Sequence, residues 1–295
     1  MASADSFIKL PDGRVLEYLL EGDVSRPVVL LSNSLLAPMS LWDPFAAKLK
    51  QERFRVLRYN QPGHGASTSP GDENGTTFCS LAADVSILLQ TLGLNVVFAW
   101  IGISMGAATG VVFAASNPGV VHHLIAADTI TSSPVIAGVD DPFGPWVELA
   151  KRDRSNVIKI LSEKTLERWF SEEWRTSNPQ EISRLRQLMN TTDVDGFITC
   201  CRALQSNTFD LKPYLLKLGA AVDEALFIAG QLDAKLPTTM DDMRKKAQKS
   251  FEAAGKANSP IELVVIEKAG HVPVIDGERQ FSDVVLGYLR AWNQT

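Results

Sequence analysis

Short apolar runs alternate with amphipathic segments along much of the chain. Apolar, β-branched runs of this kind predict buried strands, here at residues 7–10, 15–20, 28–32, 54–59, 96–101, 121–129, 225–229 and 261–266. Apolar positions at helical spacing predict helices at residues 42–50, 78–92, 107–116 and 281–292. Strands that alternate with helices indicate an α/β protein with a mostly parallel, doubly wound sheet.

The strand rhythm stops between residues 132 and 213. Helical patterns take over there, at residues 146–152, 157–162, 166–174, 181–189 and 194–205. A helical insertion between two sheet strands predicts a lid, and lids exclude water and shape a pocket. We therefore expect a core made of residues 1–131 and 214–295, with a helical cap formed by residues 132–213.

The segment Gly102-Ile103-Ser104-Met105-Gly106 lies between a predicted buried strand and a predicted helix. A G-x-S-x-G sequence in that context is typical of a nucleophile elbow. Its tight turn holds the serine at strained backbone angles, and the two glycines avoid side chains that would clash. The following helix N-terminus offers N–H groups and a positive dipole end to a developing oxyanion. We therefore expect Ser104 to be a nucleophile.

Composition narrows the class of protein. Of 295 residues 45% are hydrophobic and 21% charged, with a net charge of −5 and no basic run, so nucleic acid is not expected as a partner. Residues 85–121 contain no charged side chain, and this stretch is longer than the ~20 residues of a membrane span. Polar residues and Gly93 interrupt it, so it fits a helix, a strand and a second helix of a covered sheet. No membrane association is expected.

The cysteines and histidines support neither a disulfide framework nor a metal site. Cys79, Cys200 and Cys201 form an odd set without CxxC spacing, which predicts reduced thiols in a cytoplasmic compartment. The N-terminal residues 1–9 are polar and include Asp5, unlike a signal peptide. The four histidines are dispersed or merely adjacent, so no metal ligand cluster is predicted.

A serine nucleophile needs a general base and an orienting carboxylate, and this fold type places them in the chain order Ser, Asp or Glu, His. His271 follows the last predicted strand and is the expected base. Asp233 follows the strand at 225–229 and is the expected acid, whereas Asp128, at the end of an earlier strand, is the alternative. Asp276 is too close to His271 in sequence to orient it easily.

An oxyanion hole needs two N–H donors. We expect one from the Met105 amide and the other from the Leu35 amide, in the loop after the strand at 28–32. His64 lies between Gly63 and Gly65, which indicates a tight turn and a structural histidine rather than a second base.

These motifs together resemble the α/β-hydrolase superfamily, with matches from about Leu20 to Ile275. Within it, several stretches look like the 3-oxoadipate enol-lactonases: residues 31–35, 58–60, 63–67, 167–170 and 195–203. The resemblance implies a cofactor-free Ser-His-Asp hydrolase of a small lactone or ester, with Ser104, Asp233 and His271 as the matching triad. It also implies an α/β-hydrolase fold with a helical lid.

The chain departs from that family at three positions. Leu36 replaces a usual glycine, Pro62 replaces a usual arginine before Gly-His-Gly, and Ala107 replaces a second glycine after the elbow. Leu36 and Pro62 are expected near the mouth of the pocket, so these changes favour a less charged, larger substrate. Ser34, Leu36, Trp169 and Phe170 are the expected substrate contacts, although aromatic residues at helical spacing also fit a lid core.

The sequence thus predicts a serine hydrolase that cleaves a small lactone or carboxylic ester. A carbon–carbon bond hydrolase or lyase, or a biosynthetic enzyme of secondary metabolism, is the alternative with the same triad. A ligand receptor without turnover is a third reading, against which the intact triad argues. The expected partner is a small-molecule substrate, and a homodimer stays open.

Overall fold

The computed structural model describes residues 6–294 and contains one eight-stranded sheet. The strands are β1 (Ser6–Lys9), β2 (Val15–Glu21), β3 (Val28–Ser32), β4 (Arg55–Tyr59), β5 (Val97–Ile103), β6 (Val121–Ala127), β7 (Glu224–Gly230) and β8 (Glu262–Ile266). Their order is β1-β2-β4-β3-β5-β6-β7-β8. The pairs β1–β2 and β2–β4 are antiparallel, and all the pairs from β4 across to β8 are parallel. The predicted mostly parallel sheet is confirmed.

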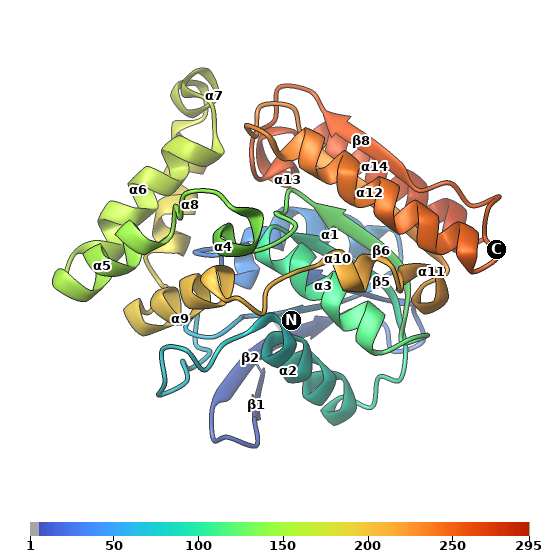
Figure 1. Cartoon of the computed structure of the whole chain (residues 1–295), viewed down its shortest axis with the longest axis horizontal. Helices are drawn as coiled ribbons and strands as arrows, with labels where there is room; N and C mark the ends of the chain where they lie inside the picture. The colour runs from blue at the N-terminus through green and yellow to red at the C-terminus, as the bar shows by residue number, and fades with distance from the viewer. Residues whose placement is uncertain (1–5, 295) are drawn as a thin grey trace.

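Helices cover both faces of this sheet (Figure 1). The chain moves from β3 to β4 in one direction and then, through α2 (Phe78–Thr91), reverses to β5, β6, β7 and β8. Because parallel crossovers are right-handed, this reversal puts α1 (Asp43–Gln51) on one face. α2, α3 (Met105–Ser116) and α12 (Leu236–Ala253) lie on the other. α14 (Glu278–Trp292) packs against α1 through Phe45 and Phe281, whose ring centroids are 5.4 Å apart.

The reversal creates a topological switch point between β3 and β5. In open α/β sheets, ligands bind at the carboxyl ends of the strands at such a point. The loops that follow β3 and β5 begin at Asn33 and Ser104, so the predicted oxyanion loop and the predicted nucleophile lie at this edge.

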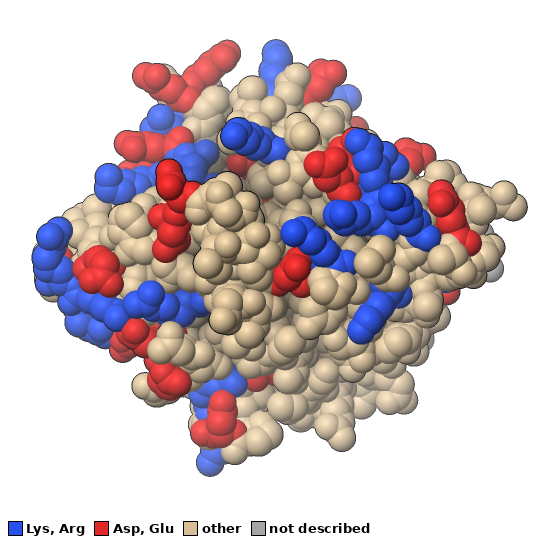
Figure 2. Space-filling model, in the orientation of Figure 1, with Lys and Arg blue, Asp and Glu red and all other residues tan. Residues whose placement is uncertain are grey.

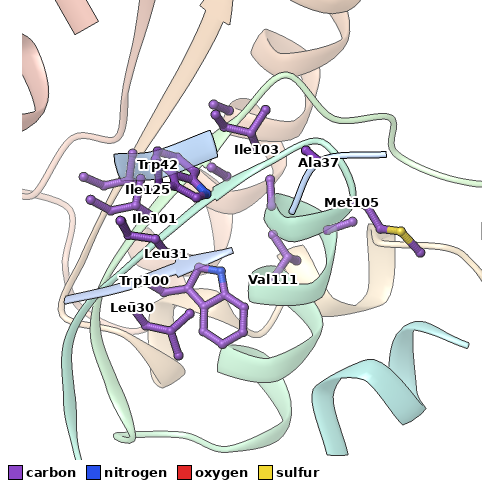
Figure 3. Packing of buried hydrophobic residues seen from close by; sticks show 14 of the residues in the cluster. Leu30, Leu31, Ala37, Trp42, Trp100, Ile101, Ile103, Met105, Val111 and Ile125 are labelled. Atoms are coloured by element: carbon purple, nitrogen blue, oxygen red, sulfur yellow. The ribbon is translucent and has the colours of Figure 1, made fainter. Parts of the chain in front are cut away.

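The core is built from the apolar strands and the small-residue helix α3. β3 is buried along its whole length, and β5 is buried at all positions but Phe98. Trp100 on β5 stacks against Phe113 on α3 at 5.2 Å between ring centroids. Figure 3 shows Ile103 and Met105, the two neighbours of Ser104, in this buried packing. The elbow is therefore anchored on both sides by close-packed side chains.

Short helices fill the chain between β6 and β7, and α5 to α8 form a group to one side of the sheet (Figure 1). The helices are α4 (Pro134–Ala137), α5 (Gly144–Arg152), α6 (Val157–Trp169), α7 (Glu172–Ser177), α8 (Pro179–Met189), α9 (Val194–Gln205), α10 (Lys212–Leu215) and α11 (Leu218–Ala221). A bridge between Ser132 and Asp210 joins the two ends of the insertion. α10 and α11 pack against α3 and α12, so they adjoin the sheet layers.

The prediction of one helix over 166–174 is wrong. α6 ends at Trp169 because Phe170 is extended, and α7 starts afresh with Ser171 as N-cap, its hydroxyl accepting a hydrogen bond from the Trp174 amide at 3.2 Å. The sequence prediction also missed α12. Other short helices are η1 (Met39–Trp42) and α13 (Pro273–Asp276).

Within residues 6–294, no helix is both long and apolar enough to cross a membrane. On the face in Figure 2, lysine and arginine side chains are interspersed with acidic ones. All three cysteines are free thiols: Cys79 is exposed, while Cys200 and Cys201 are buried.

Candidate active site

Ser104 occupies a strained turn between β5 and α3. Its φ of 55° and ψ of −117° lie outside the usual regions for a residue with a side chain. The Ser104 amide donates a hydrogen bond to the Ala127 carbonyl at 2.8 Å, which fixes the turn to the end of β6. A Cβ on Gly102 would lie 2.4 Å from the Gly106 carbonyl oxygen, and one on Gly106 would lie 2.3 Å from that of Ser32. Both glycines are therefore required by close backbone approach.

His271 and Asp233 meet at the same edge of the sheet. Asp233 follows β7 and His271 follows β8, and His271 Nδ1 lies 2.5 Å from Asp233 Oδ2. Both side chains are about 95% buried. Burial lowers the pKa of His271, and the charge of Arg168 lowers it further, while Asp233 opposes both. Burial would raise the pKa of Asp233, but His271 and then Arg168 bring it below its usual range. His271 is therefore a neutral imidazole whose Nδ1–H donates a hydrogen bond to the ionised carboxylate of Asp233.

The other imidazole nitrogen is available for chemistry. His271 Nε2 is buried and has no hydrogen-bond partner within residues 6–294. Ser104 is partly exposed, and its hydroxyl makes no hydrogen bond to another described residue. Contacts between a nucleophile and its base are often long without substrate and tighten in the complex. The fold therefore leaves an imidazole nitrogen without a partner among residues 6–294 and a partly exposed serine at the same edge of the sheet.

The two predicted oxyanion donors differ from Leu36 in that their amides have no acceptor among the described residues. The Leu36 amide donates to His64 Nε2 at 2.9 Å, whereas neither the Leu35 amide nor the Met105 amide donates to a described acceptor. Leu36 has a φ of 63°, a left-handed conformation that glycine adopts without strain. The family glycine that Leu36 replaces would suit this position for that reason.

His64 supports this loop rather than the chemistry. It is fully buried, and its Nδ1 lies 2.9 Å from the Pro62 carbonyl, so Nδ1 carries the proton and Nε2 accepts from Leu36. Burial lowers the pKa of His64 to about 4. A neutral, doubly hydrogen-bonded imidazole of this kind is a structural histidine.

Asp128 lies next to Asp233 and does not take its place. The hydrogen bond of His271 Nδ1 goes to Asp233, while Asp128 Oδ1 accepts a hydrogen bond of 2.9 Å from the Gly230 amide. Asp276 Oδ2 accepts from the Gly270 amide at 2.6 Å and so orders the loop just before His271. Sequence reasoning weighed both aspartates only as partners of His271 and missed these contacts.

The predicted substrate contacts are buried. Trp169 packs beside His271 with ring centroids 5.6 Å apart, and its indole N–H has no acceptor among residues 6–294. Phe170 stacks on Trp174 at 4.7 Å, as in a lid core. Ser34 and Leu36 are 3% and 1% exposed. Their roles in substrate binding stay predictions.

Arg168 is the site residue that sequence reasoning missed. It lies on the last turn of α6, is exposed, and forms no hydrogen bond or ion pair with another described residue. Nearby protein lowers its pKa by desolvation, partly offset by the charge of Asp233. Its charge lowers the pKa of His271, against the opposing charge and hydrogen bond of Asp233. Arg168 lies in the stretch 167–170 that resembles the enol-lactonases, but only Trp169 and Phe170 of that stretch were predicted as substrate contacts.

No cluster of three or more His, Cys, Asp or Glu side chains in the described part of the chain is arranged to hold a metal ion. The chemistry on view is that of a serine, an imidazole, a carboxylate and free backbone amides. Such a set can attack a carbonyl carbon and stabilise the resulting oxyanion.

Known proteins share this architecture. The chain is 26% identical to 3-oxoadipate enol-lactonase 2 of Acinetobacter baylyi, over 94% of each protein. It is 28% identical to 3-oxoadipate enol-lactonase 1 of the same organism, over 95% of this chain and 94% of the relative. The crystal structure of the enol-lactonase from Burkholderia xenovorans matches with a TM-score of 0.80 and 27% identity, over 97% of this chain and 100% of that one.

The resemblance predicted from the motifs is thus confirmed across nearly the whole chain. A family model described as the alpha/beta hydrolase fold matches residues 27–278, which include both the strands of the sheet from β3 onward and the inserted helices. The chain therefore belongs to the α/β-hydrolase fold family.

Proposed function

We propose that this protein is a serine hydrolase that cleaves a lactone or small carboxylic ester through Ser104, His271 and Asp233. The observation that carries the proposal is the His271 imidazole, whose Nδ1 lies 2.5 Å from Asp233 Oδ2 and whose buried Nε2 has no hydrogen-bond partner in the described part of the chain. Ser104 presents its hydroxyl at the adjoining elbow. The enol-lactonase relatives support an ester-type bond as the target.

The reaction follows from these positions. Ser104 Oγ attacks the substrate carbonyl carbon while His271 Nε2 takes the serine proton, and Asp233 stabilises the imidazolium. The Met105 and Leu35 amides donate to the oxyanion, each contributing about 2.7–4 kcal/mol of transition-state stabilisation. The carbon–oxygen bond of the ester then breaks, and His271 returns the proton to the leaving oxygen. In a lactone, that oxygen stays attached to the acyl chain.

Water completes the cycle. His271 Nε2 takes a proton from water, whose oxygen attacks the acyl carbon and releases Ser104 with its proton restored. The products are one carboxylic acid and one hydroxyl group, which in a lactone belong to the same molecule. From an enol lactone the hydroxyl group is released as an enol, which tautomerises to a ketone while the carboxylic acid stays as it is. No redox step or added reactant other than water is needed.

Arg168 favours a substrate that carries an anionic group. Pro62 alone suggests a less charged substrate, because it stands where the family usually has an arginine. Arg168, on α6, supplies a positive charge from a different part of the chain. A cation that lowers the pKa of His271 also opposes formation of the imidazolium in the transition state. A substrate carboxylate near Arg168 would neutralise it and remove that cost while also anchoring the molecule. We therefore propose a carboxylate-bearing lactone or ester as the preferred substrate.

A fluorophosphonate probe tests the nucleophile. It should label the wild-type protein at Ser104, as located by peptide mass spectrometry, and should not label Ser104→Ala. A p-nitrophenyl ester should be turned over with kcat reduced by about 10⁴-fold or more in Ser104→Ala. Turnover that is equal in the two proteins would overturn the proposal.

Paired substrates test the charge preference. A lactone or ester with a free carboxylate should be hydrolysed with higher kcat/KM than its methyl-esterified analogue. Arg168→Met should lower kcat/KM for the anionic compound by about 10-fold to 100-fold, the effect of losing one charged hydrogen bond. It should not lower kcat/KM for the neutral compound at a pH well above the acidic limb, because removing the cation there only eases formation of the imidazolium. Lys159→Met is the matched control, because it removes a positive charge from an exposed position on the same helix. An equal effect on both compounds would exclude carboxylate recognition by Arg168.

A further inference from the structure

Asp128 is a fully buried carboxyl group with no positively charged partner among residues 6–294. It follows β6 directly, is 0% exposed, and has a φ of 45°. Its amide donates to the Ile228 carbonyl at 3.1 Å, and its Oδ1 accepts from the Gly230 amide at 2.9 Å. These two contacts hold both the backbone and the side chain of Asp128 against β7. Oδ2, however, has no N–H or hydroxyl donor among the described residues.

The group that faces Asp128 is another carboxyl, that of Asp233. The two side chains are within hydrogen-bonding contact. Two ionised carboxylates cannot share such a buried position, because their repulsion is barely screened there. A hydrogen bond between two carboxyl groups also needs one proton, since a carboxylate oxygen can only accept. One of the two aspartates therefore carries that proton.

The surroundings decide which aspartate is protonated. Asp233 faces His271 Nδ1 at 2.5 Å and feels the positive charge of Arg168, and both favour its ionised form. Asp128 has only the Gly230 amide to favour ionisation, while burial, Asp233 and Asp276 all oppose it. The pKa of Asp128 is accordingly raised well above its usual range, chiefly by burial. The proton belongs on Asp128.

We propose that Asp128 is a positioning residue for the triad: a neutral carboxylic acid whose Oδ2–H donates a hydrogen bond to the Asp233 carboxylate. Oδ1 accepts from Gly230, so the orientation of the carboxyl is fixed and Oδ2 points its proton at Asp233. Asp233 is then held between two donors, Asp128 and His271 Nδ1. It stays ionised and cannot turn away from the imidazole. This catalytic consequence rests on the proposed hydrolase function, but the protonation state does not.

Infrared difference spectroscopy tests the protonation state without turnover. At about pH 6 an ordinary aspartate is ionised, so a carboxylic acid C=O band in the wild-type protein reports a retained proton. Asp128→Asn should remove one such band. Asp276→Asn is the matched control, because burial raises the pKa of Asp276 to about 7 and it should account for a second band that titrates near that pH. If no acid band is lost in Asp128→Asn, Asp128 is ionised and the proposal is wrong.

Kinetics test the positioning role. Asparagine keeps a carbonyl for Gly230 and an N–H for Asp233, so Asp128→Asn should retain kcat within a few-fold, on the order of the loss of one neutral hydrogen bond at most. Asp128→Leu has no donor and should lower kcat by about 10-fold to 100-fold. Asp233→Asn should lose about 10⁴-fold, the effect of disturbing the imidazole tautomer. A loss of that size in Asp128→Asn would instead make Asp128 the triad acid.

The acidic limb of the pH profile separates a neutral Asp128 from an ionised one. Replacing a neutral acid by neutral asparagine leaves the charge near His271 unchanged, so the limb of kcat/KM should stay where it is. Removing a negative charge would lower the pKa of His271 and move the limb to lower pH, which would overturn the proposal. These readouts remain decisive if Asp128→Leu fails to fold. They also distinguish this proposal from the hydrolase assignment, since Ser104→Ala tests that alone.

Discussion

The backbone carbonyl of Trp169 accepts a hydrogen bond of 3.0 Å from the backbone amide of His271. The last residue of α6 therefore holds the loop that carries the imidazole, and the Trp169 ring packs beside that imidazole at 5.6 Å between centroids. The inserted helices and the sheet are thus joined at His271, the proposed base. A change in the position of α6 would move His271.

Trp169→Ala should therefore affect both stability and turnover. The ring is 1% exposed, and removing a buried tryptophan costs about 3–5 kcal/mol. His271 loses its neighbour, so kcat should fall as well. Trp169→Phe keeps an aromatic ring and should recover most of both losses. Thermal unfolding and steady-state kinetics measure the two effects.

Trp174→Ala is the control for that experiment. Trp174, on α7, stacks on Phe170 in the extended segment between α6 and α7. Trp174 is only partly buried. Its removal should lower the unfolding temperature with little change in kcat at a temperature where the variant is folded. Equal losses of kcat in Trp169→Ala and Trp174→Ala would show that the ring beside His271 has no special role.

Arg168 should set the pH at which the enzyme loses activity in acid. The base must be neutral to accept the serine proton, so kcat/KM falls as the pH drops through the pKa of His271. Burial and then Arg168 lower that pKa, so activity persists to lower pH than an ordinary histidine allows. Arg168→Met removes the cation and should raise the pKa of His271. The acidic limb should then move to higher pH.

The pH dependence of kcat/KM measures this shift, with a neutral ester as substrate so that substrate charge does not change. Lys159→Met again serves as the control and should leave the limb in place. If the acidic limb of Arg168→Met is unchanged or lies at lower pH than that of the wild type, the charge of Arg168 does not lower the pKa of His271.

The strands and the elbow could be predicted from sequence because they depend on local pattern. Buried parallel strands are nearly continuous apolar runs, and β3 and β5 lie within three residues of their predicted ends. The helix α12 was missed, although its Pro237 at the first turn is a helix-start signal. Polar and charged residues such as Asp241 and Lys245 occupy much of its length, so its apolar positions are few. It is held by packing against β7 and β8, which no single segment reveals.

The chain order of Ser104, Asp233 and His271 could be predicted because the fold fixes it. The contacts that surrounding residues make with them could not be predicted. Asp128 and Arg168 reach the site from β6 and from the inserted helices, and their importance lies in contacts between segments distant in sequence. A sequence shows that a buried aspartate ends a strand, but whether it faces histidine or a second carboxylate depends on register and on side-chain orientation.

Gly106→Ala should prevent correct formation of the elbow. A Cβ there would lie 2.3 Å from the Ser32 carbonyl oxygen and 2.7 Å from the Asn33 amide nitrogen, and both are backbone atoms that cannot move aside separately. α3 would have to shift away from β3. We expect low yield of folded protein, or a large loss of both unfolding temperature and fluorophosphonate labelling. Gly119→Ala is the control, since a Cβ there would have no atom within 4 Å from any described residue beyond Gly119 and its two chain neighbours. Its positive φ of 78° makes some strain expected there, so comparable losses in both variants would contradict a steric role for Gly106.

His64 should make the protein less stable in acid. The buried imidazole has a pKa of about 4, against about 6.5 when unfolded. Between these two values the unfolded chain binds a proton that the folded protein does not, so the free energy of unfolding decreases as the pH falls from 6.5 to 4. The shift corresponds to about 3 kcal/mol.

His64→Gln removes this titration but not that of His123, whose pKa burial also lowers to about 4. The difference in unfolding free energy between wild type and His64→Gln should therefore change by about 3 kcal/mol from neutral pH to pH 4, in favour of the variant in acid. Urea unfolding at several pH values measures it. A difference that stays constant with pH would mean that folding does not lower the pKa of His64. Because His64 Nε2 accepts from the Leu36 amide beside the predicted oxyanion donor Leu35, the variant should also lower kcat at neutral pH. The loss should stay below the roughly 10²–10³-fold effect of removing an oxyanion donor outright.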